Sequence, residues 1–239
     1  MTETKDKSTK PVMTTRTTAR GRWGWYCVAV GLTVLFVIFT LTVKWVDVQT
    51  DGTQNMGWAT VNFWWRDVIG VQRAWHVISN IMAAVTFAAV GGLMIWQIVA
   101  AVRGGGFRHL ARHWWVLDAV LLALCVCYLC FQVVVINYRP ILRHGVVEAA
   151  YPSSHVLLFA TVCPLAIFTV WRHTKNRTVR AVAVAFGVTV MCVGVLARLL
   201  SGYHWLTDIL GGVGLGAVLV AWYLACTVGY KLPNQPESA

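Results

Sequence analysis

The polar stretch from Arg198 to Asp208 lies between two long apolar runs and contains an arginine, a histidine and an aspartate. His204 and Asp208 are four residues apart, so a helix that begins near Trp205 would bring both side chains onto one face. A carboxylate beside one imidazole nitrogen fixes the tautomer and leaves the lone pair of the other nitrogen free. Arg198 adds a cation whose planar donors suit phosphate oxygens. The stretch indicates either a reactive histidine beside an anion site or an interfacial helix end with snorkelling polar groups.

The motif Pro152-Ser153-Ser154-His155 stands at the start of another apolar run, with the proline at a position suited to the first helical turn. Helix starts expose unpaired N–H groups that bind anions, and Ser153 and Ser154 add hydroxyl donors. The same motif is also typical of an ordinary helix cap. At a phosphoryl site, His204 can attack phosphorus and His155 can protonate the leaving oxygen.

A metal site is the competing use of a histidine and an aspartate at helical spacing. Arg139 and Arg198 would repel a divalent ion there, and no third carboxylate or cysteine is evident. We therefore expect a phosphoryl pocket that uses no metal and no other cofactor.

The composition places these motifs in a membrane protein. Of the 239 residues, 58% are hydrophobic and only 12% are charged, which is typical of a polytopic membrane protein. The net charge of +11 is explained by topology, and no nucleic-acid-binding module is visible. All seven cysteines fall inside apolar runs, so we interpret them as small buried or lipid-facing residues and not as a disulfide framework.

The apolar runs predict an all-α fold, a bundle of six transmembrane helices. Each run is near the roughly 20 residues needed to cross a bilayer. We expect a disordered basic cytoplasmic tail over 1–22, a transmembrane domain over 23–230 and a short cytoplasmic tail over 231–239. Residues 44–73 are predicted to form an extramembrane loop that lies partly in the interface, because they are rich in tryptophan. The runs cover about 23–43, 74–102, 114–136, 152–171, 179–200 and 205–230.

The distribution of lysine and arginine predicts the orientation. Fourteen of the 20 lie in the N-terminal tail, the loops near 103–112 and 172–180, and the C-terminal tail. By the positive-inside rule, both termini are then cytoplasmic. The alternation of the helices brings Arg139, His155, Arg198 and His204 to the other face, which predicts one extracytoplasmic site in the cell membrane.

Taken together, three motifs resemble the signature of the type-2 phosphatidic acid phosphatase superfamily, whose catalytic core is shared with the vanadium haloperoxidases. The family pattern is K-x6-RP, then PSGH, then SR-x5-H-x3-D. The resemblance includes order and spacing and covers roughly residues 74–228. The corresponding segments here are Gln132-x6-Arg139-Pro140, Pro152-Ser153-Ser154-His155 and Ala197-Arg198-x5-His204-x3-Asp208.

The resemblance implies a role for each matching residue. His204 would be the nucleophile that forms a phosphohistidine, Asp208 its partner and His155 the general acid. Arg139, Arg198 and Ser153 would bind the phosphate, and no metal would be required.

Three positions depart from the family pattern. Gln132 replaces a lysine, Ser154 a glycine and Ala197 a serine. The loss of a cation and a hydroxyl weakens binding of a highly charged group, so affinity or substrate choice would differ from typical members. Gln132 and Ser154 remain candidate substrate-binding residues by position.

The sequence therefore predicts a membrane enzyme that removes a terminal phosphate from a lipid phosphate or diphosphate. Isoprenyl diphosphate, phosphatidic acid and phosphatidylglycerophosphate are candidate substrates. Two alternatives stay open, a lipid head-group phosphotransferase and a catalytically idle phospholipid-binding protein. The oligomeric state also stays open, because Gly211, Gly212, Gly214 and Gly216 permit close helix packing within one chain or between chains.

Overall fold

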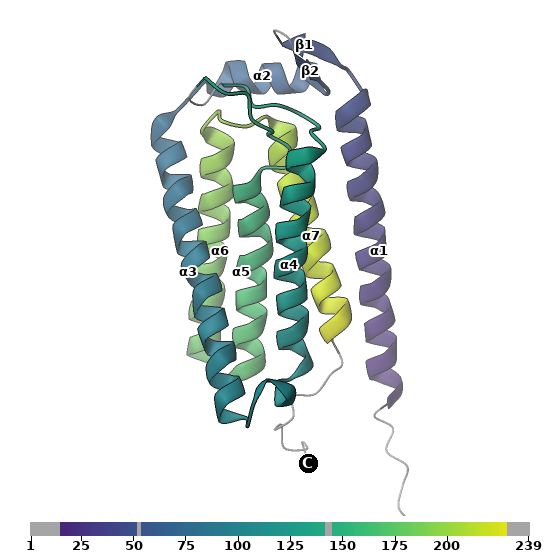
Figure 1. Cartoon of the computed structure of the whole chain (residues 1–239), viewed down its shortest axis with the longest axis vertical. Helices are drawn as coiled ribbons and strands as arrows, with labels where there is room; N and C mark the ends of the chain where they lie inside the picture. The colour runs from purple at the N-terminus through teal and green to yellow at the C-terminus, as the bar shows by residue number, and fades with distance from the viewer. Residues whose placement is uncertain (1–14, 52–53, 142–144, 229–239) are drawn as a thin grey trace, which may run out of the picture.

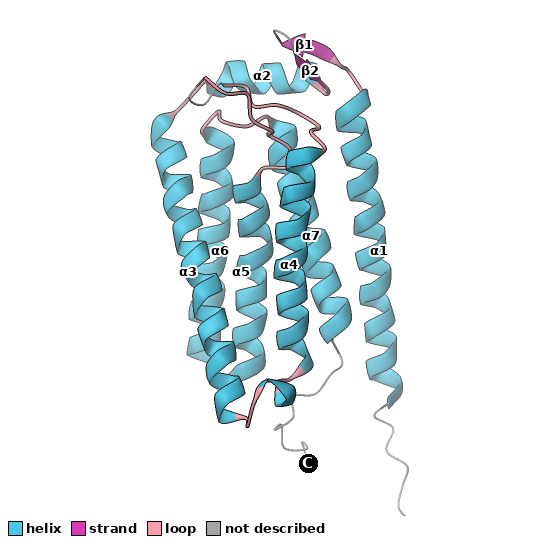
Figure 2. Ribbon diagram, in the orientation of Figure 1, coloured by secondary structure: helices cyan, strands magenta, loops and turns pink. Residues whose placement is uncertain are grey.

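The computed structural model describes residues 15–51, 54–141 and 145–228, and within them the fold is a bundle of long helices (Figures 1 and 2). Six helices are long and apolar enough to cross a membrane, which confirms the predicted all-α bundle. In a bilayer the backbone polar groups must bond internally, and a helix satisfies this requirement within each segment. The six are α1 (Thr15–Trp45), α3 (Arg73–Arg103), α4 (Arg112–Val133), α5 (Ser154–His173), α6 (Arg177–Leu200) and α7 (Leu206–Thr227).

A seventh helix, α2 (Ala59–Ile69), lies across one end of the bundle (Figure 1). It follows an antiparallel hairpin of β1 (Gln49–Asp51) and β2 (Gln54–Met56). The 3-10 helix η1 (Phe107–His109) lies at the opposite end. We refer to these as the α2 end and the η1 end; the start of α1 and the end of α7 both lie toward the η1 end (Figure 1).

Helices α5 and α7 form the centre of the bundle. Just over half of their apolar windows is buried, 56% in each, against 11% in α1 and in α4. Glycines of α7 permit this packing: a Cβ on Gly216 would fall 2.5 Å from the Cβ of Ala160, and one on Gly211 would meet the ring of Tyr151. These close contacts are therefore made within one chain.

Several predicted boundaries were wrong. Helix α1 begins at Thr15, so part of the predicted 1–22 tail is helical, because a helix propagates from an apolar span more easily than it starts anew. The rest of that tail and the predicted 231–239 tail lie outside the described residues. Pro152 is not in a first turn, since Ser153 is the N-cap and α5 begins at Ser154. The predicted 44–73 loop contains the hairpin and α2.

Candidate active site

His204 is the centre of a buried polar cluster at the α2 end. It lies in the loop between α6 and α7, and its Nδ1 is 3.3 Å from Oδ2 of Asp208. The same carboxylate oxygen accepts a hydrogen bond from the backbone N–H of Trp205 at 3.0 Å. Asp208 therefore both caps α7 and orients the imidazole. The predicted pair is thus brought together, although His204 precedes the helix. With Nδ1 protonated toward the carboxylate, Nε2 carries the lone pair.

Two guanidinium groups converge on that lone pair. Nη2 of Arg198 lies 2.9 Å and Nη1 of Arg139 lies 3.3 Å from Nε2 of His204. A guanidinium only donates hydrogen bonds, so Nε2 must be the acceptor. Burial of the ring lowers the pKa of His204 well below its ordinary value, and the charges of Arg198, Arg139 and His155 lower it further. The ring is therefore neutral, with an available nucleophilic nitrogen.

The loop after α4 positions Arg139. The loop folds back on itself through a bridge between Tyr138 and Ala149, and the Arg139 N–H donates to the carbonyl of Glu148 at 3.1 Å. The Glu148 carboxylate forms an ion pair with Nε of Arg139 at 2.9 Å. Trp205 joins this loop to the segment that contains His204, because its indole N–H donates to the Tyr138 carbonyl at 2.6 Å. Arg139 thus has a nearby counter-ion on its own loop.

The Pro-Ser-Ser-His motif lies beside Asp208. The backbone N–H of Ser153 donates to the Asp208 carbonyl at 3.0 Å, which joins the start of α5 to the start of α7. The Ser153 hydroxyl is fully buried, and it has no hydrogen-bond partner among the described residues. A buried hydroxyl costs free energy when it is unpaired, so an anion that accepts from it would be stabilised.

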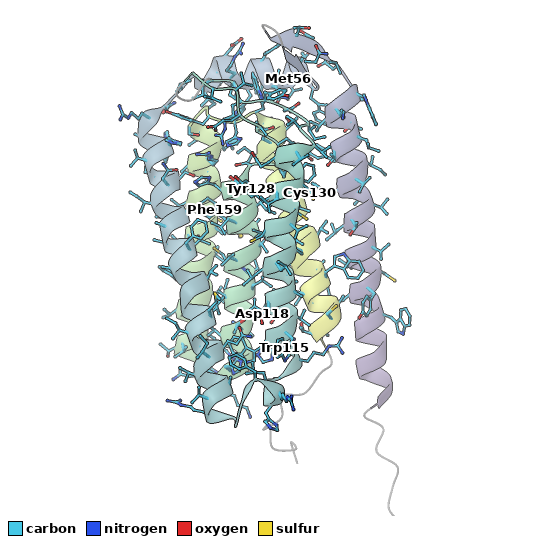
Figure 3. All side chains as sticks on the ribbon, in the orientation of Figure 1. Met56, Trp115, Asp118, Tyr128, Cys130 and Phe159 are labelled. Carbon is cyan, nitrogen blue, oxygen red and sulfur yellow. The ribbon has the colours of Figure 1, made fainter. Side chains whose placement is uncertain are left out.

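Ser154 and His155 lie in the first turn of α5 and line an apolar pocket of about 430 Å³. The pocket lies between α3, α4 and α5 and falls in the size range of small-molecule sites. Tyr128, one of its walls, is labelled in the half of α4 nearer the α2 end (Figure 3). The other lining residues are Phe87, Leu124, Cys125, Leu129, Leu157 and Leu158.

Two of the positions that depart from the family pattern have no hydrogen bond to this cluster in the described part of the chain. Gln132 is in the last turn of α4 with its side chain exposed, and within the described part of the chain no hydrogen bond joins it to the arginines or histidines. Ala197 is buried in α6. The binding role of Gln132 therefore remains a prediction.

Four residues of the cluster were missed by the sequence analysis. The amide of Asn137 lies 3.3 Å from the Thr207 hydroxyl and 3.5 Å from Oδ1 of Asp208. Asn62 of α2 donates to the Thr207 hydroxyl at 3.0 Å and accepts its backbone N–H at 3.2 Å. His76 of α3 contacts Arg198. An amide or imidazole at the edge of an apolar run was the only available signal, and it is a weak one.

Part of the chain is similar to a known protein family. Residues 130–231 match the family model described as the PAP2 superfamily. The match includes Arg139, His155, Arg198, His204 and Asp208, while α1, α2 and α3 lie outside it.

One solved structure similar to this chain is described as the first transmembrane PAP2-type phosphatidylglycerolphosphate phosphatase, from Bacillus subtilis. The TM-score is 0.55 at 17% sequence identity, and the match covers 82% of this chain and 93% of that one. At this identity the similarity shows the fold alone. A search of curated proteins found no significant match.

Proposed function

We propose that this protein is a membrane phosphatase that removes a terminal phosphate from a lipid. The observation that carries the proposal is the convergence of Arg198 and Arg139 on Nε2 of His204, while Asp208 holds the other ring nitrogen. Two cations at a nucleophilic nitrogen create a site where a phosphate can replace the guanidinium contacts.

The proposed reaction begins when phosphoryl oxygens accept hydrogen bonds from the two arginines and the buried hydroxyl of Ser153. Nε2 of His204 then attacks phosphorus in line with the leaving oxygen, and His155 gives a proton to that oxygen. The bond from phosphorus to the lipid oxygen breaks, and a phosphohistidine forms. Asp208 stabilises the positive imidazole during this step.

Water completes the cycle in the second step. His155, now neutral, takes a proton from a water molecule that attacks the phosphohistidine. The bond between phosphorus and Nε2 breaks, inorganic phosphate leaves, and His204 returns to its neutral form. No step in this sequence needs a metal ion.

The apolar pocket supports a lipid as the substrate. Its walls on α3, α4 and α5 are almost entirely apolar, and His155 lies at its polar edge. An alkyl chain in this pocket would bring its phosphate to the side of the cluster that carries the proposed general acid. The similar phosphatidylglycerolphosphate phosphatase suggests a phospholipid head group, and isoprenyl diphosphates have the same chemistry at the scissile bond.

The proposed location is the extracytoplasmic face of the cell membrane. Arg103 and Arg172 lie at the ends of helices that point away from His204, and the positive-inside rule assigns such ends to the cytoplasm. A fluorescent protein that folds only in the cytoplasm, fused to the C-terminus, should fluoresce. A dark fusion that is present at normal levels would reverse the orientation.

The decisive experiment measures phosphate release by the purified protein from phosphatidic acid, phosphatidylglycerophosphate and an isoprenyl diphosphate, with and without a chelator. We expect release from at least one lipid in both conditions, and a loss of at least about 10³-fold in His204→Ala. His109→Ala, an exposed histidine at the η1 end, is the control. Full activity in His204→Ala would exclude the mechanism, and a phosphorylated acceptor in place of free phosphate would indicate phosphotransfer.

A further inference from the structure

His76 contacts the terminal nitrogen of Arg198 that does not contact His204. Nη1 of Arg198 lies 3.0 Å from Nδ1 of His76, which is in the first turn of α3 and outside the PAP2 match. The guanidinium can only donate, so Nδ1 of His76 must accept. The hydrogen of this neutral ring is then on Nε2. Arg198 is thus held between two imidazole lone pairs, one from each histidine.

The ring of His76 is fixed on its other sides. It stacks on Tyr203 with centroids 3.9 Å apart and planes 8° apart. Its Nε2 lies 3.3 Å from Nδ2 of Asn80, one turn further along α3. Because Nε2 carries the ring hydrogen when Nδ1 accepts from Arg198, the Asn80 amide has to turn its oxygen to the ring to accept that hydrogen, and amide orientation is assigned from such networks. The Arg198 contact therefore selects the tautomer, and the stacking on Tyr203 fixes the ring.

Backbone contacts also join the start of α3 to the loop between α6 and α7, which contains His204. The N–H of Gln72 donates to the carbonyl of Ser201 at 2.9 Å. Gly202 has φ +72°, and a Cβ there would fall 1.9 Å from the carbonyl oxygen of Gly70. Such an approach requires glycine. The distance between His76 and Arg198 is therefore set by two segments in direct contact.

We propose that His76 is a positioning residue, which orients Arg198 so that its Nη2 faces the phosphate beside His204. This inference rests on the proposed function, since it takes the site to bind a phosphate. An arginine side chain loses much rotational freedom when it is ordered, and a partner that already fixes it leaves less to lose on binding. Arg198 is fully buried, so removing His76 as acceptor would cost a buried hydrogen bond to a charged group.

Two substitutions separate positioning from packing. His76→Phe keeps a ring on Tyr203 but removes the acceptor, whereas His76→Asn removes the ring and keeps an acceptor oxygen near the position of Nδ1. If His76 positions Arg198, His76→Phe should lower kcat/KM and weaken inorganic phosphate binding by about tenfold or more, as for a lost hydrogen bond to a charged group. His76→Asn should stay within about threefold of wild type. If the ring only packs, the order of the two variants reverses.

A double-mutant cycle tests whether the effect passes through Arg198. In the Arg198→Lys background, His76→Phe should cost much less than it does in wild type, because the oriented guanidinium is already absent. Equal costs in both backgrounds would overturn the inference. His109→Phe, at the exposed η1 end, controls for a general effect of replacing a histidine with phenylalanine.

Calorimetric binding of inorganic phosphate and turnover of lipid phosphate are measured on the same purified variants. If wild type binds phosphate without hydrolysing lipid phosphate, the proposed function fails, and the phosphate affinities of the two variants still decide the role of His76. If wild type hydrolyses lipid phosphate and both variants match it in both assays, the role of His76 is overturned and the function stands. If wild type does neither, both proposals fail.

Discussion

Both ends of the bundle contain a buried histidine, but at the α2 end arginine donors meet the imidazole lone pair of His204, whereas at the η1 end two imidazoles contact each other. At the η1 end, Nε2 of His113 lies 2.8 Å from Nε2 of His173, so one nitrogen donates and the other accepts. The ring of His173 lies against Trp96 and Trp114, with centroids 4.8 Å and 5.2 Å apart. The contact uses the Nε2 lone pair of one ring and the Nε2 hydrogen of the other, so at neither ring do an aspartate and arginines meet the two nitrogens as they do at His204 in the described contacts.

The comparison shows that the partners of a histidine decide its chemistry more than its burial does. At the α2 end, Asp208 takes one ring nitrogen of His204, and arginine donors meet at the other. A phosphate can displace arginine donors and gain their hydrogen bonds itself. At the η1 end, an incoming phosphate would have to separate two aromatic-packed rings, so that pair is better suited to holding α4 against α5.

The largest expected effect comes from removing the carboxylate of Asp208, which orients His204. Asp208→Asn should lower kcat by roughly 10³-fold or more, because the amide can present its N–H to Nδ1 and favour the wrong tautomer. Phosphate release by the purified variant measures this. Asp118→Asn is the matched control near the η1 end, where Asp118 accepts a hydrogen bond from Gln97 at 2.7 Å (Figure 3). Similar losses in both variants would contradict the assignment.

A smaller effect should follow from filling the apolar pocket. Cys125→Trp places a large ring among the pocket walls without touching His204, so KM for a long-chain lipid phosphate should rise by about tenfold, as expected for the loss of one or two buried methylene contacts. A short-chain soluble phosphate ester should be unaffected. Cys130→Trp, on the same helix but outside the pocket, is the control. An equal rise for both esters would argue against chain binding there.

At the η1 end we expect an effect on stability alone. His113→Phe removes the hydrogen bond to Nε2 of His173, which should cost about 0.5–1.5 kcal/mol of unfolding free energy and lower the melting temperature by a few degrees. Because His113 is remote from His204, kcat per folded molecule should remain within about twofold of wild type. Thermal melting and turnover of the same sample measure the two quantities. A large fall in kcat with normal melting would give this pair a direct part in turnover.

The smallest effect concerns pH. The folded-state pKa of His204 lies well below its ordinary value of 6.5, so only the unfolded chain takes up a proton there as the pH falls below that value. The contribution of His204 to stability is therefore present above pH 6.5 and declines below it, by on the order of 1 kcal/mol over the first pH unit. Melting temperatures of wild type and His204→Gln at pH 7.0 and 5.5 measure this. The variant should lose less stability on acidification; an equal loss would mean that His204 titrates normally.

Much of the fold was predictable because the length of a run of apolar residues identifies a membrane-spanning helix. Each of the six spans was found from its run of about 20 apolar residues. The short helix α2 was missed as a helix, because 11 residues rich in tryptophan also fit an irregular interfacial loop. The start of α1 at Thr15 was missed because the polar residues before the apolar run do not indicate a membrane-spanning helix.

The sequence by itself determined that Arg139, His155 and His204 lie at one end of the bundle, because the number of membrane crossings between them fixes the end at which each one emerges. Only the tertiary structure decided how they meet. The partners Asn62 and His76 are 145 and 122 residues away from Thr207 and Arg198. Helices that are apolar all round carry little information about which side faces inward, so their rotation is set by packing such as that of Gly216 on Ala160.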